Sequence, residues 1–78
     1  MPGIRLGPYR IRFFQADLQE KAHVHVYREH KEAKYWLTPV DLFRNKGFRE
    51  HELNEIEQLL REHQDLLLAL WNREMKKR

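Results

Sequence analysis

The chain has 78 residues, which predicts a single domain over residues 1–78 that buries only about 60% of the surface its unfolded form exposes. It contains no cysteine and no apolar run long enough for a membrane span or a secretory signal, so we exclude disulfides and thiolate sites and expect a cytoplasmic protein without membrane contact. The formal net charge of +3 favours an anionic partner, although this charge is also ordinary for the solubility of a small protein.

Three runs of alternating apolar and polar residues predict β-strands. They cover about residues 9–15, 23–28 and 32–37, and a polar stretch over residues 16–22 suits a loop between the first two. Only a short charged turn separates the second run from the third, which favours an antiparallel hairpin. The sequence therefore predicts a three-stranded antiparallel sheet.

Two helices are expected after this sheet. Thr38 can cap a helix, Pro39 suits its first position and Gly47 suits its end, so we predict a short helix over about residues 39–45. Apolar residues at a spacing of three and four predict a long C-terminal helix over about residues 50–74. The expected fold class is α+β, with both helices packed on one face of the sheet.

Strand alternation assigns a group of cationic and aromatic side chains to the sheet face away from the helices. Cations neutralise phosphates and aromatic rings stack on unpaired bases, so this face is a candidate site for RNA or DNA. The alternative is an ordinary solvated face, since antiparallel sheets commonly carry Arg, Lys and His there. The candidate nucleic-acid-binding residues are Arg10, Arg12, Tyr27, Lys34 and Trp36.

His23 and His25 on the same predicted face suggest two further hypotheses. As candidate catalytic residues, the two imidazoles can act as the general acid and general base of a metal-independent ribonuclease. The His-x-His spacing also suits two ligands of a divalent metal, but no third ligand follows at a fitting spacing. We therefore predict no metal and no other cofactor, and we favour a non-enzymatic role while leaving the enzyme hypothesis open.

The end of the last helix is rich in large apolar residues, among them Leu66, Leu70 and Trp71. A small sheet cannot cover all of them, so we expect contact with a protein partner or with a second copy of the chain. A helix-turn-helix interpretation of residues 39–62 is disfavoured, because the acidic start of its second helix would repel phosphate.

Seven segments together resemble domain-of-unknown-function family 4160. These segments are residues 1–4, 9–14, 23–26, 32–37, 45–48, 52–56 and 70–72. The chain departs from the family pattern where Lys21 and Ala22 replace two prolines before His23 and His25. The resemblance implies a small prokaryotic protein associated with another small domain of unknown function and linked to toxin–antitoxin modules, but it brings no established activity.

From these observations we predict a component of a bacterial toxin–antitoxin-like module. It would act by protein–protein contact and by RNA or DNA binding through the sheet face, and a weaker form of this hypothesis makes it a small ribonuclease toxin. The alternative is a non-enzymatic interaction or regulatory subunit with no nucleic-acid role. Salt separates the two, because phosphate binding weakens steeply as salt rises and an apolar contact does not.

Overall fold

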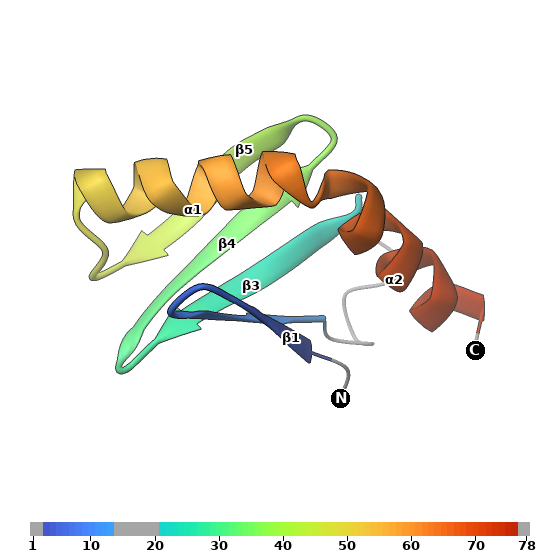
Figure 1. Ribbon diagram of the computed structural model, residues 1–78, viewed down its shortest axis with the longest axis horizontal. Coiled ribbons are helices and arrows are strands. Elements are labelled where there is room, and N and C mark those ends of the chain that lie inside the picture. The colour runs from blue at the N-terminus through green and yellow to red at the C-terminus, as the bar shows by residue number, and fades with distance from the viewer. Residues whose placement is uncertain (1–2, 14–20, 77–78) are drawn as a thin grey trace.

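The computed structural model describes residues 3–13 and 21–76. Two helices follow one antiparallel sheet whose strands pair in chain order. The helix α1 lies across one face of the sheet, and α2 changes direction and continues beyond the end of the sheet (Figure 1). In the described part of the chain, no helix has the length and apolar character needed to cross a membrane. The elements are β1 (Gly3–Leu6), β2 (Tyr9–Arg12), β3 (His23–Arg28), β4 (Lys31–Leu37), β5 (Val40–Lys46), α1 (Glu50–Glu62) and α2 (Gln64–Lys76).

The α+β class is confirmed, but the sheet has five strands where three are expected. The strand β1 is short, and only Ile4 and Leu6 alternate within it, so its sequence alone is a weak signal. It forms because Gly7, with φ of 59°, allows a tight turn that returns the chain along β2. Residues 14 and 15 of the first predicted strand, and 16–20 of the predicted loop, lie outside the described residues.

The short helix predicted over residues 39–45 is wrong, because this segment forms β5. Thr38 and Pro39, joined by a cis peptide bond, make the turn between β4 and β5 instead of starting a helix. Gly47 adopts the expected positive φ, 99°, but it follows a strand. Pairing with β4 along its length outweighs the local helix-start signals, since an isolated helix this short is marginal.

The long helix predicted over residues 50–74 is two helices that meet at His63. The backbone N–H of His63 donates to the Leu59 carbonyl at 3.1 Å, and His63 Nδ1 lies 2.9 Å from the same oxygen. The Gln64 side-chain amide donates to the Leu37 carbonyl at the end of β4. The change of direction has two causes: the His63 side chain contacts a carbonyl of the helical hydrogen-bond ladder, and the Gln64 hydrogen bond ties the start of α2 to the sheet.

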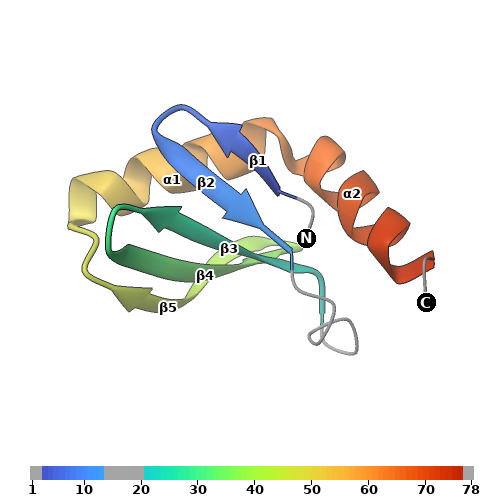
Figure 2. The same cartoon turned by 90° about the horizontal axis from the view of Figure 1, so that it is seen from below.

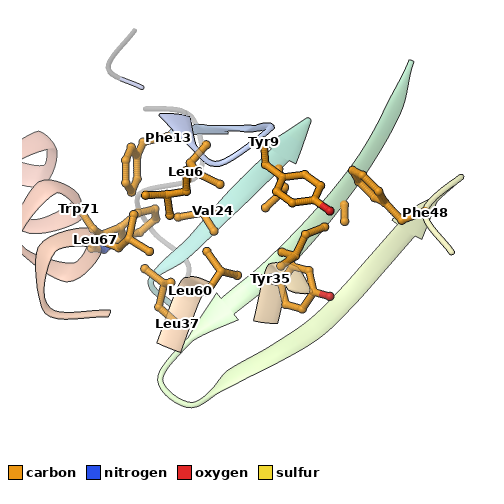
Figure 3. Close-up of a cluster of buried hydrophobic side chains, with 14 residues drawn as sticks. Leu6, Tyr9, Phe13, Val24, Tyr35, Leu37, Phe48, Leu60, Leu67 and Trp71 are labelled. Carbon is orange, nitrogen blue, oxygen red and sulfur yellow. The ribbon is translucent and has the colours of Figure 1, made fainter. Parts of the chain in front are cut away.

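The core lies between the sheet and the helices (Figure 3). Tyr9 and Tyr35 are buried in it, yet their hydroxyls reach α1, where Tyr9 donates to Glu55 at 2.6 Å and Tyr35 donates to Glu57 at 3.2 Å. Burial, with the neighbouring carboxylate, raises the pKa of Tyr9 to about 12 and also raises the pKa of Tyr35. The other fully buried side chains of the core include Ile11, Phe13, Val24, Val26, Ala33, Leu37, Ile56, Leu60 and Leu67.

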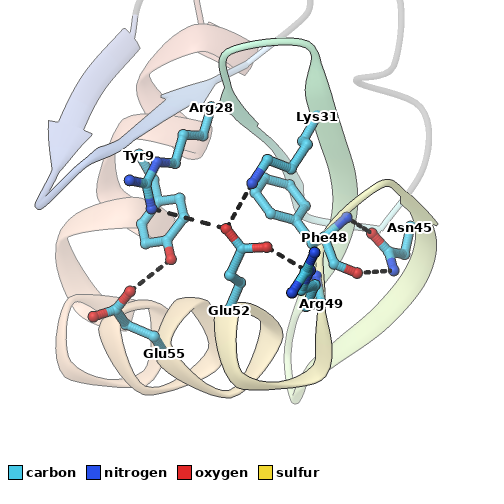
Figure 4. A network of polar contacts seen from close by, with 8 residues as sticks. All are labelled: Tyr9, Arg28, Lys31, Asn45, Phe48, Arg49, Glu52 and Glu55. Atoms are coloured by element: carbon cyan, nitrogen blue, oxygen red, sulfur yellow. Dashed lines mark hydrogen bonds and ion pairs between the residues drawn. The ribbon is translucent and has the colours of Figure 1, made fainter.

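Glu52 connects the first turn of α1 to the sheet (Figure 4). The backbone N–H of Arg49 donates to its Oε1 at 2.9 Å, and Lys31 Nζ donates to its Oε2 at 2.8 Å. Arg28 Nη1 lies 3.8 Å from the same Oε2. The Arg49 hydrogen bond, followed by that of Lys31, lowers the pKa of the Glu52 carboxyl to about 2. This carboxylate therefore stabilises the packing of α1 while it is ionised.

Candidate nucleic-acid interface

The sheet face opposite the helices carries two rows of polar side chains. Figure 2 shows α1 along one side of the sheet only. The antiparallel register sets Arg5, Arg10 and Tyr27 side by side across β1, β2 and β3. The next row runs across β2 to β5 and consists of Arg12, His25, Lys34 and Arg44. The predicted grouping of Arg10, Arg12, Tyr27 and Lys34 on one face is therefore present, and β1 and β5 add cations to it.

An aromatic pair lies beside the second row. The Trp36 and Phe43 rings are 5.1 Å apart at an interplanar angle of 69°. Lys34 Nζ lies 5.3 Å from the centre of the Trp36 ring and 4.8 Å from that of Phe43, within the range of cation–π contacts. The side chain of Lys21 approaches Trp36 as well, at 5.8 Å. The predicted neighbours Lys34 and Trp36 thus belong to a cluster that is both cationic and aromatic.

Phe43 is a member of this cluster that the alternation of residues in the sequence does not predict. It is 54% exposed, which is unusual for a large apolar side chain. The strand pairing shifts here, since Lys34 pairs with Arg44 and Tyr35 pairs with Leu42, so Phe43 is the extra residue of a bulge. Val40, Asp41 and Leu42 alternate over only three residues before the adjacent Phe43 interrupts the pattern, so the sequence alone offers no signal that identifies Phe43.

The two histidines differ in accessibility. His23 is 0% exposed, whereas His25 is half-buried, so the expectation that both imidazoles face solvent is wrong for His23. The His23 ring lies 4.9 Å from Trp71 of α2, 5.6 Å from Trp36 and 5.5 Å from His25, and its Nδ1 lies 2.7 Å from the Lys21 carbonyl oxygen. A general acid or base must come within hydrogen-bond reach of its substrate, so the catalytic role of His23 and His25 stays a prediction that this arrangement does not favour.

The described residues do not bring three His, Asp or Glu side chains together as a group that could hold a metal ion. His23 and His25 do lie next to each other, as the His-x-His spacing predicts. The ring of His23 is enclosed by indoles, which supply no ligand for a divalent metal.

The predicted partner-binding residues on α2 are divided between core and surface. Trp71 is 3% exposed and packs in the core of its own chain, so it is not available to a partner in this structure. Leu66 is 48% exposed and Leu70 is half-buried. A protein contact at the end of the helix stays a prediction, and of the three residues Leu66 is the one with a largely accessible side chain.

The family model of the Domain of unknown function (DUF4160) matches residues 9–72. This match spans most of the chain, and the chain therefore belongs to the DUF4160 family. No curated protein and no solved structure matches it. The family description carries no activity, so a function has to be argued from the geometry of the sheet face.

Proposed function

We propose that this DUF4160 protein binds single-stranded nucleic acid through the open face of its sheet. The observation that carries the proposal is the cross-strand register, which places Arg10 and Arg12 on the same sheet face as Lys34 and its aromatic neighbours Trp36 and Phe43. Cationic side chains neutralise backbone phosphates, and exposed rings stack on bases. The face combines both contacts within one surface.

A single strand fits this surface better than a duplex does. Bases in a single strand can be splayed onto a flat protein surface, whereas a duplex keeps the faces of its bases inside the stack. The Phe43 ring is largely exposed, and Lys34 lies over both rings of the pair, where a phosphate next to a stacked base would find a positive charge. The aromatic pair therefore favours unpaired bases as the ligand.

The test is the affinity for short labelled RNA and DNA single strands, measured over a series of salt concentrations. We expect log affinity to fall linearly with log salt, with a slope of about −2 if three phosphates are neutralised. Phe43→Ala should lose about 1–3 kcal/mol of binding free energy through the missing stack, and Arg12→Gln should reduce the salt slope by about 0.7.

Leu66→Ala is the matched control, because Leu66 is also an exposed large apolar residue but lies on α2. It should bind nucleic acid like the unaltered protein. Salt-independent binding, or equal losses for Phe43→Ala and Leu66→Ala, would contradict the proposal. A thermal melt of each variant separates lost binding from lost folding.

The broader prediction of a toxin–antitoxin-like module adds a protein partner to this binding activity. Its non-enzymatic form is supported by the burial of His23 beneath Trp71, which keeps that imidazole from a bound strand. We therefore expect RNA to keep its length during incubation with the protein, as judged on a denaturing gel. Shortening that His25→Ala abolishes would support the ribonuclease form instead.

A further inference from the structure

A hollow of about 370 Å³ opens where the β1–β2 turn and the β3–β4 turn lie at the same end of the sheet. Its lining includes three arginines from three different strands. Its lining consists of Arg5, Pro8, Arg10, Tyr27, Arg28 and Glu29. A volume of this size is at the small end of ligand-binding sites and suits one nucleotide.

Two of these arginines, Arg5 and Arg10, bring positive charge to the hollow, whereas Arg28 is paired with Glu52. Arg5 and Arg10 are direct cross-strand partners, and like charges in such positions destabilise a sheet. Within residues 3–13 and 21–73, neither guanidinium forms an ion pair with a carboxylate. An anionic ligand between them would relieve this repulsion.

We propose that this hollow holds the terminal phosphate monoester of a single-stranded nucleic acid, an inference that rests on the proposed function. A phosphate monoester carries about two negative charges at neutral pH, whereas an internal phosphodiester carries a single charge. Each guanidinium can donate two parallel hydrogen bonds to two oxygens of one phosphate. A terminal phosphate has more free oxygens than an internal phosphodiester, so Arg5 and Arg10 together favour the end of a strand over its interior.

The remaining lining residues suit a nucleotide better than a bare anion. Tyr27 is the cross-strand partner of Arg10 and lines the hollow, where its ring can stack on the base of the terminal nucleotide. The Glu29 carboxylate can accept a hydrogen bond from a sugar hydroxyl, a donor that a nucleotide carries and a bare anion lacks. Arg28 also lies near Glu52, at 3.8 Å, and over the Tyr9 ring, so this network holds it in position at the edge of the hollow.

The hollow is continuous with the rest of the proposed binding face. A further hollow of about 260 Å³ is lined by Arg10, Arg12, Tyr27 and Glu29, and therefore shares three residues with the first. Tyr27, in the hollow, pairs with Glu32 of β4, and Trp36 lies four residues further along the same strand. The separation along β4 between the hollow and the aromatic pair is therefore about 13 Å. One strand can thus place its phosphorylated end in the hollow and later bases on the aromatic pair.

The experiment compares one RNA sequence in three forms: with a 5′-phosphate, with a 3′-phosphate and with hydroxyls at both ends. We expect one phosphorylated form to bind at least about tenfold more tightly than the hydroxyl form, through its charge-assisted hydrogen bonds. Arg5→Gln should remove most of this gain. Arg44→Gln changes a cation of the same face outside the hollow, and it should weaken all three RNAs alike.

Two other outcomes would overturn the terminal-phosphate site alone, and a third would overturn the proposed function with it. Equal, salt-sensitive binding of all three RNAs would overturn the terminal-phosphate site and leave the binding face in place. A gain that survives both Arg5→Gln and Arg10→Gln would place the end of the strand elsewhere. Absence of binding for all three RNAs would overturn the proposed function together with this inference. Both arginines are exposed, so thermal melts should find these variants folded.

Discussion

The two faces of the sheet follow the same alternation of side chains, but one is buried and apolar and the other is exposed and rich in cations. On the helix side, Tyr9, Val26 and Tyr35 are at most 1% exposed, and every buried side-chain nitrogen and oxygen of the described residues has a hydrogen-bond partner. On the open side, Arg5 lies directly opposite Arg10, although this arrangement costs stability. The helix face is thus explained by folding, whereas the arrangement of charges on the open face is not, and we propose a ligand for it.

The stability of the protein should depend mainly on the side chains packed between the helices and the sheet. Leu60 of α1 is 0% exposed, so Leu60→Ala should cost about 2–5 kcal/mol of unfolding free energy through lost burial and the cavity left behind. Leu66→Ala, at a position 48% exposed, should change it by less than about 0.5 kcal/mol. Urea denaturation measures both. The milder Leu60→Met serves if the alanine variant does not fold. Similar losses of unfolding free energy at the two positions would show that stability does not depend on burial at the helix face.

The next effect concerns the carboxylate that holds α1 on the sheet. The folded protein lowers the pKa of Glu52 from 4.5 to about 2, so its stabilising contribution is complete above pH 4.5 and is lost as the pH falls towards 2. Glu52→Gln removes the ionisable group, so its melting temperature should be several degrees lower at pH 7 and should fall less between pH 4.5 and pH 2.

Thermal melts at pH 7, 4.5, 3 and 2 measure this difference for Glu52→Gln and for a control, Glu62→Gln. Glu62 is exposed at the end of α1, where its carboxylate accepts a hydrogen bond from Gln58. The control should follow the unaltered protein at every pH. Parallel acid curves for the unaltered protein and Glu52→Gln would show that this carboxylate does not contribute in the expected way.

Local patterns predict the fold only where local interactions decide it. The strand over residues 23–28 is confirmed, because alternation with a period of two depends on neighbouring residues. The strand β5 could not be predicted in this way, since Thr38 and Pro39 match a helix start and only pairing with β4 reveals a strand. The break at His63 likewise depends on a contact between Gln64 and Leu37, which are 27 residues apart in sequence.

In the candidate site, too, the sequence predicts features that depend on one strand and misses features that depend on contacts between elements. Alternation correctly places Arg10, Arg12 and Lys34 on one face, because it determines the side of the sheet on which a residue lies. Alternation does not determine which residues of other elements pack against that residue. His23 is an example, because Trp71 of α2 packs against its ring and it is fully buried. The bulge that exposes Phe43 is also a property of the pairing between two strands, so no single strand predicts it.

On the open face, replacing a cation should stabilise the protein, because Arg5 lies directly opposite Arg10. Without ligand, Arg5→Gln removes the repulsion between Arg5 and Arg10, so it should raise the unfolding free energy by about 0.2–1 kcal/mol. Urea denaturation at low salt measures it, and raised salt should shrink the gain because exposed charges are screened. Arg44→Gln is a weaker test of the same kind, since its neighbour Lys34 also contacts two aromatic rings. A loss of stability in Arg5→Gln would mean that this arginine supports the fold, and the open face would then need no ligand to explain it.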